Sequence, residues 1–295
     1  MLRRRRASAA GKVEMEHEEH DDFGGLQRDL LATGAINRRG LFRLASRLGA
    51  AAAAVPLIHC GGSSPTSPTT TNTDTSTGTT GTTGTGGTAC STVPQETAGP
   101  YPGDGSNGPD VLSLSGVVRS DIRSSFAGLQ GIADGVPLTI ALTIVSASTC
   151  APLSGRAVYV WHCDRLGRYS LYTSGATDQN YLRGVQAADG SGRVSFTSIF
   201  PACYSGRWPH IHFEVYPSLS AATDVGNKIA TSQIALPKET CDQVYATSGY
   251  EESVTNLSRV SLATDMVFSD GATLELGTIS GSIGGGLTAT LTVAV

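Results

Sequence analysis

A tract of 28 residues, 61–88, contains only Gly, Ser, Thr, Pro, Asn and Asp, and 13 of these residues are Thr. The tract has almost no apolar surface to bury, so nothing offsets the entropy that would be lost on ordering it. We therefore predict a disordered tether that separates a leader, 1–60, from a folded part, 89–295. With roughly 200 residues, the folded part has the length of one sandwich or barrel domain.

Charge is distributed unevenly along the chain. Residues 1–60 carry 10 Lys and Arg against 7 Asp and Glu, whereas residues 61–295 carry 11 against 18. The second part is therefore acidic, with a formal charge of −7. Proteins that bind nucleic acid or anionic membranes do so through a basic face, so we expect no nucleic-acid partner. The sequence leaves the oligomeric state open.

The leader has the features of an export signal. Arg38 and Arg39 precede an Ala-rich apolar run, 44–58, which is too short to be a stable membrane anchor. This pattern predicts a twin-arginine-type signal, which exports proteins that have already folded. Cys60 lies in a sequence similar to a lipoprotein cleavage box, although His59 replaces the small residue expected before it. We expect an extracytoplasmic protein, either a cell-surface lipoprotein with a lipid anchor at Cys60 or a secreted protein.

The folded part has the pattern of short β-strands. Runs of apolar and β-branched residues alternate with Gly-rich and Asp-Gly turns. The predicted strands are 111–118, 138–145, 156–163, 193–200, 210–215, 229–235 and 287–295. One helix is predicted over 237–247, which begins with Pro. This order of elements predicts an all-β fold, an antiparallel β-sandwich with long loops and at most a few short helices.

The folded part contains five cysteines, and none of them forms a Cys-x-x-Cys pair: Cys90, Cys150, Cys163, Cys203 and Cys241. In an exported protein, one or two disulfides are a better interpretation than a zinc site. The sequence does not assign their pairing. An odd number of cysteines leaves at least one thiol free.

The segment 204–215 is the most informative about chemistry, because it contains His210, His212 and Glu214 at alternate positions. In a strand, alternate side chains share one face, and Cα atoms two residues apart are about 7 Å apart. Both imidazoles could therefore bind one metal ion. The alternative is a pair of surface histidines on an exposed strand. His162, the third histidine of the domain, fits better as a packed histidine with a hydrogen-bonded ring.

With only two histidines, the other ligands of such a metal would be oxygen donors. Tyr169 and Tyr204 offer phenols, and a hard trivalent cation stabilises phenolates by lowering the phenol pKa. Fe(III) suits a set of two phenolates and two imidazoles. Without the histidine pair, each tyrosine would be interpreted as a half-buried residue with a hydrogen-bonded hydroxyl.

A series of motifs surrounds these residues. In chain order they are Trp161-His162-Cys163-Asp164, Gly167-Arg168-Tyr169, Leu182-Arg183-Gly184, Phe196-Thr197-Ser198-Ile199-Phe200-Pro201, Tyr204 and Arg207-Trp208-Pro209-His210-Ile211-His212-Phe213. In order and spacing they resemble the intradiol ring-cleavage dioxygenases, the superfamily of protocatechuate and catechol dioxygenases, and especially its exported single-domain members. The resemblance extends over residues 90–270. Several motifs in the same order are far more specific than one His-x-His pair.

The resemblance implies a β-sandwich that binds one mononuclear, non-haem Fe(III) through Tyr169, Tyr204, His210 and His212. It also implies that Tyr204 is the ligand that leaves when substrate binds, whereas Tyr169 stays. Arg207 takes the position of the family arginine that stabilises negative charge on the substrate ring.

Two further positions match the family less closely. Gln233 corresponds to a glutamine of the pocket, and Tyr101 belongs to a Gly-Pro-Tyr motif near the substrate entrance, where Ala98 replaces the usual Glu. Only residues 205–206 separate the second Tyr from the Arg, although many members have a longer insertion here. A shorter loop predicts a more open pocket.

The implied function is Fe(III)-dependent intradiol cleavage of a catechol-type aromatic diol with O2, giving a muconate-type dicarboxylic acid. Catechol, protocatechuate, hydroxyquinol and larger lignin-derived catechols all remain open as substrates. The alternative is a secreted, non-catalytic β-sandwich binding module, in which Trp161, Trp208 and tyrosines form a contact surface and the histidines are incidental. A hydrolase is not favoured, because the folded part contains neither a Gly-x-Ser-x-Gly motif nor a His-Glu-x-x-His motif.

Overall fold

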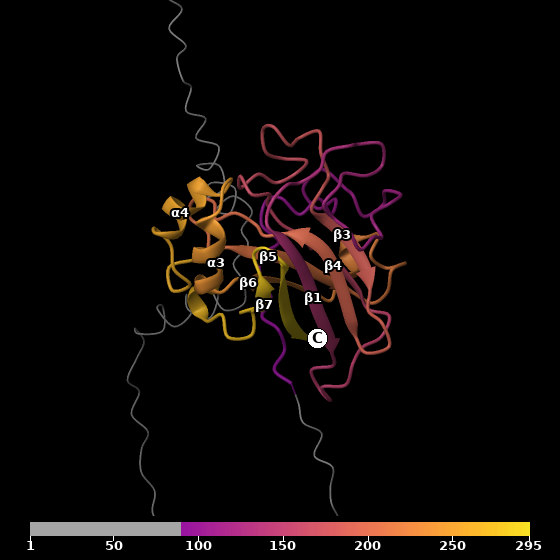
Figure 1. The fold of residues 1–295 in the computed structure, drawn as a ribbon. Helices are drawn as coiled ribbons and strands as arrows, with labels where there is room; N and C mark the ends of the chain where they lie inside the picture. Colours follow the sequence, from indigo (N-terminus) through magenta and orange to yellow (C-terminus); the bar gives the residue numbers. More distant parts are fainter. Residues whose placement is uncertain (1–89) are drawn as a thin grey trace, which may run out of the picture. The chain divides into compact units, whose positions relative to one another are not determined.

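The computed structural model describes residues 90–295, which contain two four-stranded sheets (Figure 1). The predicted export signal, the predicted lipid anchor at Cys60 and the predicted tether lie outside the described residues. The first sheet has the order β4 (Arg193–Ile199), β1 (Pro137–Val145), β8 (Gly286–Ala294) and β7 (Thr278–Ser282). The second has the order β3 (Arg183–Ala187), β2 (Ala157–Trp161), β5 (His210–Tyr216) and β6 (Ala230–Ala235).

Helices are few and short. They are α3 (Lys238–Tyr245), α4 (Glu251–Leu257) and the 3-10 turns η1 (Val225–Asn227) and η2 (Phe268–Asp270). None of the helices in the described part is long and apolar enough to cross a membrane. The predicted all-β sandwich with at most a few short helices is therefore confirmed.

Strand pairing is antiparallel with one exception. β1 pairs antiparallel with β4 but parallel with β8, so that Ile140 faces Phe196 on one side and Ala289 on the other. All neighbours in the second sheet are antiparallel. Because β1 and β8 are far apart in the sequence, their parallel pairing needs no tight turn.

The core lies between the two sheets. Side chains on alternate positions of β1, including Ile140 and Leu142, are fully buried, and they belong to the same cluster as Ile211, Phe213 and Val215 of β5. This alternation is what a two-layer sandwich requires, because each strand sends every second side chain toward the partner sheet.

The second sheet is also covered on its outer face, since every residue of β2, β5 and β6 is buried. Residues 90–102 form an extended arm. It begins beside the first sheet, where the Val93 amide donates to the Ala294 carbonyl of β8, and from Glu96 on it lies over this face of the second sheet. The arm is held by hydrogen bonds from the Glu96 amide to the Thr231 carbonyl of β6, and from the Tyr159 hydroxyl of β2 to the Pro102 carbonyl. A covered outer face can hold polar side chains away from water.

Six of the seven predicted strands are confirmed, and so is the helix within 237–247. The predicted strand 111–118 is wrong. It forms successive turns, in which the Leu114 amide donates to Val111 and the Val117 amide donates to Leu114, and Val118 alone makes an isolated bridge. Gly116 in this segment has a φ of +96°, which a strand does not allow. β3, β7 and α4 were not predicted, because their sequences are polar or contain Gly.

One disulfide is present in the described chain, between Cys90 and Cys150, so the lower of the two predicted numbers is observed. Cys163, Cys203 and Cys241 are free and buried. The disulfide fastens the start of the arm to the turn that follows β1.

Candidate metal centre

β5 supplies the two histidines. His210 and His212 occupy the face opposite Ile211 and Phe213, which belong to the core, so the histidine rings lie on the covered outer face of the second sheet. Both histidines are buried, with 2% and 3% of their surface exposed. They are not a surface pair, and the alternative interpretation as exposed histidines is wrong.

Tyr169 follows a tight turn after β2. The Asp164 carboxylate accepts hydrogen bonds from the amides of Leu166 and Arg168, at 2.9 and 3.0 Å, and thereby closes this turn. Gly167 lies at its tip with a φ of +78°, and a Cβ atom there would be only 3.1 Å from the Cβ atom of Tyr204. The turn therefore brings the two tyrosine segments together.

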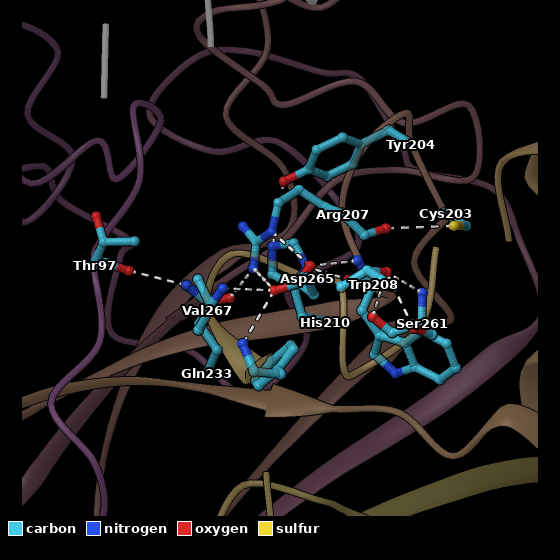
Figure 2. Close-up of polar contacts among 12 residues, drawn as sticks. Thr97, Cys203, Tyr204, Arg207, Trp208, His210, Gln233, Ser261, Asp265 and Val267 are labelled. Atoms are coloured by element: carbon cyan, nitrogen blue, oxygen red, sulfur yellow. Dashed lines mark hydrogen bonds and ion pairs between the residues drawn. The ribbon is translucent and has the colours of Figure 1, made fainter. Parts of the chain in front are cut away.

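Tyr204 begins a second tight turn, closed by a hydrogen bond from the Arg207 amide to the Tyr204 carbonyl. Gly206, the third residue of this turn, has a φ of +81°, the value that type II turns require at this position. The turn explains why only two residues separate Tyr204 from Arg207. It places both side chains over the same face of β5, as Figure 2 shows.

The four predicted ligands converge. The hydroxyl oxygens of Tyr169 and Tyr204 each lie 3.3 Å from Nε2 of His210, and this atom lies 3.1 Å from Nε2 of His212. His162 does not join them, because its ring is hydrogen bonded to the Cys163 carbonyl and the Ser198 hydroxyl. Two imidazole nitrogens and two phenol oxygens are thus brought together.

Both histidines are held in the form that binds metals. Burial, reinforced by the charge of Arg207, lowers the pKa of His210 to about 3, and burial lowers the pKa of His212 well below its ordinary value. Nδ1 of His210 donates to the Trp208 carbonyl, which leaves the lone pair on Nε2. A neutral imidazole whose other nitrogen is tied to a carbonyl is the usual arrangement of a histidine ligand.

The two phenols are buried as well. Burial raises the pKa of Tyr204 to about 12 and the pKa of Tyr169 well above its ordinary value. Both phenols therefore keep their protons at neutral pH unless a cation stabilises the phenolates. A trivalent cation would do so, and two phenolates would reduce its charge to +1.

The residues present fit such a cation. The described part of the chain contains no group of three or more His, Cys, Asp or Glu side chains that could hold a metal, so it has no zinc or calcium site of the usual kind. The converging set differs because half of its donors are phenol oxygens. Hard oxygen donors combined with imidazoles suit iron.

Arg207 and Gln233 lie next to this centre and contact each other. Arg207 is 4% exposed, and its Nη2 donates to Oε1 of Gln233 at 2.6 Å (Figure 2). Gln233 is on β6, directly opposite His212, and its Nε2 donates to the Thr97 carbonyl of the arm. The structure thus brings these two predicted residues together.

Asp265 is a residue of this site that the sequence analysis missed. Its Oδ2 accepts a hydrogen bond from Nε of Arg207 at 2.9 Å, and the two side chains form a buried ion pair. Burial alone would raise the pKa of Asp265, but the guanidinium outweighs it and holds the pKa below its ordinary value. No local pattern marks Asp265, because it lies 58 residues after its partner.

Tyr101 lies at the edge of the centre. Its ring is 5.0 Å from the ring of Tyr169, and the arm that carries it is fastened by Arg183, whose guanidinium donates to the carbonyls of Tyr101 and Pro102. Gly99, two residues earlier, approaches His212 so closely that a Cβ atom would lie 3.5 Å from Cε1. The predicted Gly-Pro-Tyr motif therefore lies against His212 and Tyr169.

The structure contradicts the surface that the binding-module interpretation requires. Trp161 is fully buried and stacks on the His212 ring, with centroids 4.8 Å apart. Trp208 is 4% exposed, and its indole donates to the Leu236 carbonyl. Neither tryptophan is available to a partner molecule.

The chain is similar to known dioxygenases. A family model described as "Dioxygenase" matches residues 108–215, a range that contains all four converging side chains. An intradiol ring-cleavage dioxygenase from Tetranychus urticae has a similar structure, with 26% identity over 70% of this chain and 94% of its own, and a TM-score of 0.55. The dioxygenase domain of a carbohydrate-binding fusion protein from Streptomyces sp. SirexAA-E is 21% identical over 70% of this chain and 98% of its own, with a TM-score of 0.44. No curated protein sequence matches the chain. The predicted resemblance to intradiol ring-cleavage dioxygenases is confirmed.

Proposed function

We propose that this protein is an Fe(III)-dependent intradiol dioxygenase. It would cleave a catechol-type aromatic diol with O2 between the two hydroxyl-bearing carbons and give a muconate-type dicarboxylic acid that contains both oxygen atoms. The proposal rests on the convergence of Tyr169, Tyr204 and His212 around Nε2 of His210, at 3.1–3.3 Å.

These four residues would hold the iron. Bound there, Fe(III) would supply a Lewis acid that binds the deprotonated diol and draws electron density from it. The neutral state of both histidines supports this role, because a protonated imidazole cannot bind a metal.

Tyr204 is the residue we assign to proton transfer. It lies at the start of the turn that ends at Arg207, and the positive charge of Arg207 opposes the rise in the pKa of Tyr204 that burial causes. As a phenolate, its oxygen can accept a proton from a hydroxyl of the incoming diol. Of the two tyrosines that would hold the iron, Tyr204 would thus be the one released and Tyr169 the one retained.

Arg207 would stabilise the negative charge that develops on a substrate oxygen. Its guanidinium is buried beside Tyr204, where water does not screen the charge. A donor that is already in place before the reaction contributes more than one that must reorganise. Gln233 holds Nη2 of Arg207 and thereby limits the orientations of the guanidinium.

The arm would exclude water and limit the substrate on one side. Gly99 and Tyr101 cover His212 and Tyr169, respectively. Ser205 and Gly206, which follow Tyr204, are exposed and form only a tight turn, and so short a loop would obstruct substituents on the ring less than a longer one. This combination favours a site that accepts catechols larger than the parent compound.

We also propose that the protein works outside the cytoplasm. The Cys90–Cys150 disulfide supports this location, because such bonds persist in oxidising compartments. Cell fractionation tests the location, and labelling with a radioactive fatty acid, compared between the wild type and Cys60→Ser, tests the lipid anchor. Label that is equal in the two proteins would contradict acylation at this residue.

The direct test of the function combines metal analysis with oxygen uptake. We expect about one iron per chain, visible absorption from tyrosinate-to-iron charge transfer, and oxygen consumption with at least one member of a catechol panel. Product spectra separate intradiol from extradiol cleavage. A folded protein that stays colourless and iron-free after loading with iron would contradict the proposal.

A further inference from the structure

Asp265 accepts hydrogen bonds from several groups through both of its carboxylate oxygens. It lies in the loop before η2, its side chain is fully buried, and Oδ1 accepts hydrogen bonds from the amides of Val267 and Phe268 at 2.8 and 3.2 Å. Oδ2 accepts hydrogen bonds from Nε of Arg207 and from the Trp208 amide, at 2.9 and 2.7 Å. The backbone at the start of η2 therefore fixes one oxygen, and the other oxygen binds Arg207 and Trp208, two residues that Figure 2 shows around Asp265.

The first consequence concerns the orientation of Arg207. A buried arginine has several rotatable bonds, and its fork-shaped guanidinium is fixed only when two or more of its nitrogens are engaged. Here Nε donates to Oδ2 of Asp265, and Nη2 donates to Gln233 at 2.6 Å and to Oδ1 of Asp265 at 3.5 Å. The described hydrogen bonds leave Nη1 as the group that can donate to a substrate.

The second consequence concerns His210. The Trp208 amide donates to Asp265, and the carbonyl of the same residue accepts the hydrogen bond from Nδ1 of His210. A single residue thus joins the carboxylate to the histidine that contacts both tyrosines. A shift of the Trp208 backbone would therefore change the positions of both the Asp265 carboxylate, which binds Arg207, and the His210 ring.

We infer that Asp265 is a positioning residue for ring cleavage. It holds Arg207 so that one N–H group remains directed at the substrate, and it fixes the Trp208 backbone that orients His210. Asp265 itself does not contact the substrate. The inference rests on the proposed function.

The primary test is Asp265→Asn, which keeps the shape of the side chain and removes its charge. We expect kcat for the best catechol of the panel to fall about 10- to 100-fold, because a misplacement of about 1 Å costs on this order. KM should change less than kcat, and the iron content and charge-transfer absorption should be retained. Loss of folding alone would not produce this pattern in the soluble, iron-loaded protein.

Glu214→Gln is the matched control. Glu214 is a fully buried carboxylate on β5, two residues from His212, and it forms an ion pair with Lys228. The substitution removes a buried charge without touching Arg207 or Trp208. We expect kcat within about twofold of the wild type, and an equal loss of kcat in both variants would overturn the assignment to Asp265.

A double-mutant cycle separates positioning from a general structural role. If Asp265 acts mainly through Arg207, adding Asp265→Asn to Arg207→Ala should lower kcat by no more than about twofold. Effects that multiply would overturn the role of Asp265 in holding Arg207. If Asp265→Asn does not fold, Asp265→Glu keeps the charge but displaces the carboxylate, and a wild-type kcat in that variant would overturn the inference as well.

The outcomes for the two proposals are distinct. If the wild type, loaded with iron, consumes no oxygen with any catechol, the proposed function fails. If the wild type turns over and Asp265→Asn turns over equally fast, only the role of Asp265 fails.

Discussion

The two sheets of the sandwich use their outer faces in different ways. In the first sheet, burial alternates along β1 and β4, and the outward residues of β8 include the exposed Thr290 and Thr292. In the second sheet, β2, β5 and β6 are buried on both faces. Both sheets contribute one face to the core, so this difference arises from the loops and the arm that cover only the second sheet.

A covered face can carry a reactive site from which water is excluded, but the buried polar groups on that face need hydrogen-bond partners within the protein. Arg183 on β3 shows how this is achieved. Its guanidinium makes five hydrogen bonds, to Ser170, Tyr159 and the carbonyls of Tyr101 and Pro102. The first sheet thus contributes mainly stability, whereas the second contributes stability and the candidate site.

The largest expected effect comes from removing a ligand on the covered face. His212→Ala and Tyr204→Phe should each abolish the charge-transfer absorption and lower kcat/KM by at least about 10³-fold, because the iron would lose one of its four protein ligands. Iron analysis, visible spectra and oxygen uptake measure the outcome. Thr292→Ala, on the exposed face of β8, is the control and should change neither activity nor stability by more than about 0.5 kcal/mol. Retained turnover in the Tyr204 variant would refute the ligand assignment.

A second substitution separates charge stabilisation from metal binding on the same face. Arg207→Ala should retain iron and its colour but lower kcat by about 10²- to 10³-fold, because a preorganised donor is lost. It should also destabilise the fold by about 3–5 kcal/mol, since Asp265 would remain buried without its ion partner. Steady-state kinetics and urea unfolding measure the two effects. Unchanged kcat in an iron-loaded variant would remove Arg207 from the reaction.

Local sequence pattern explains which strands could be predicted, and each sheet contains three predicted strands and one that was missed. Strands of the first sheet alternate between apolar and polar residues, so β1, β4 and β8 were predicted nearly to their ends. The segment 111–118 has a similar composition, but turn hydrogen bonds and the positive φ of Gly116 give it another conformation. β3 was missed because its buried Arg183 looks like an exposed residue until its partners on the arm are known.

The candidate site divides in the same way. His210 and His212 share a face through strand alternation, which is a local property, and the tyrosines were selected by their chemistry and by a family resemblance. Their convergence was a prediction that the geometry now supports. Asp265 could not be predicted, because its role depends on a contact across 58 residues of sequence.

A third prediction concerns the contact between the two sheets. His162, just after β2, is hydrogen bonded to Ser198 of β4, and burial lowers its pKa from 6.5 to about 4. As the pH falls from 6.5 to 4, the unfolded chain takes up a proton that the folded chain does not, so the free energy of unfolding decreases. The contribution of this group is at most about 3 kcal/mol.

His162→Gln removes this titration and keeps a polar side chain. Urea unfolding of wild type and variant at pH 7 and pH 4.5 should show a smaller loss of stability on acidification in the variant. If glutamine fills the site less well than histidine, it lowers the free energy of unfolding at both pH values. The difference between pH 7 and pH 4.5 within each protein does not contain this effect. Equal losses in the two proteins would show that His162 does not remain neutral in the folded state.

The smallest effect is expected at the turn that joins Tyr204 to Arg207. Gly206 has a φ of +81°, and a Cβ atom there would meet no atom within 4 Å, so Gly206→Ala tests backbone strain without a steric clash. We expect a loss of about 1 kcal/mol in the free energy of unfolding, measured in urea. Gly190, in the exposed turn between β3 and β4, is the control, because its φ is outside the left-handed region and its surroundings are equally open. Gly190→Ala should therefore be neutral or slightly stabilising, since alanine restricts the unfolded chain. Equal stability of the two variants would mean that the turn tolerates another backbone conformation. The positions of the Tyr204 and Arg207 side chains would then depend on the buried Asp265 contact rather than on the turn.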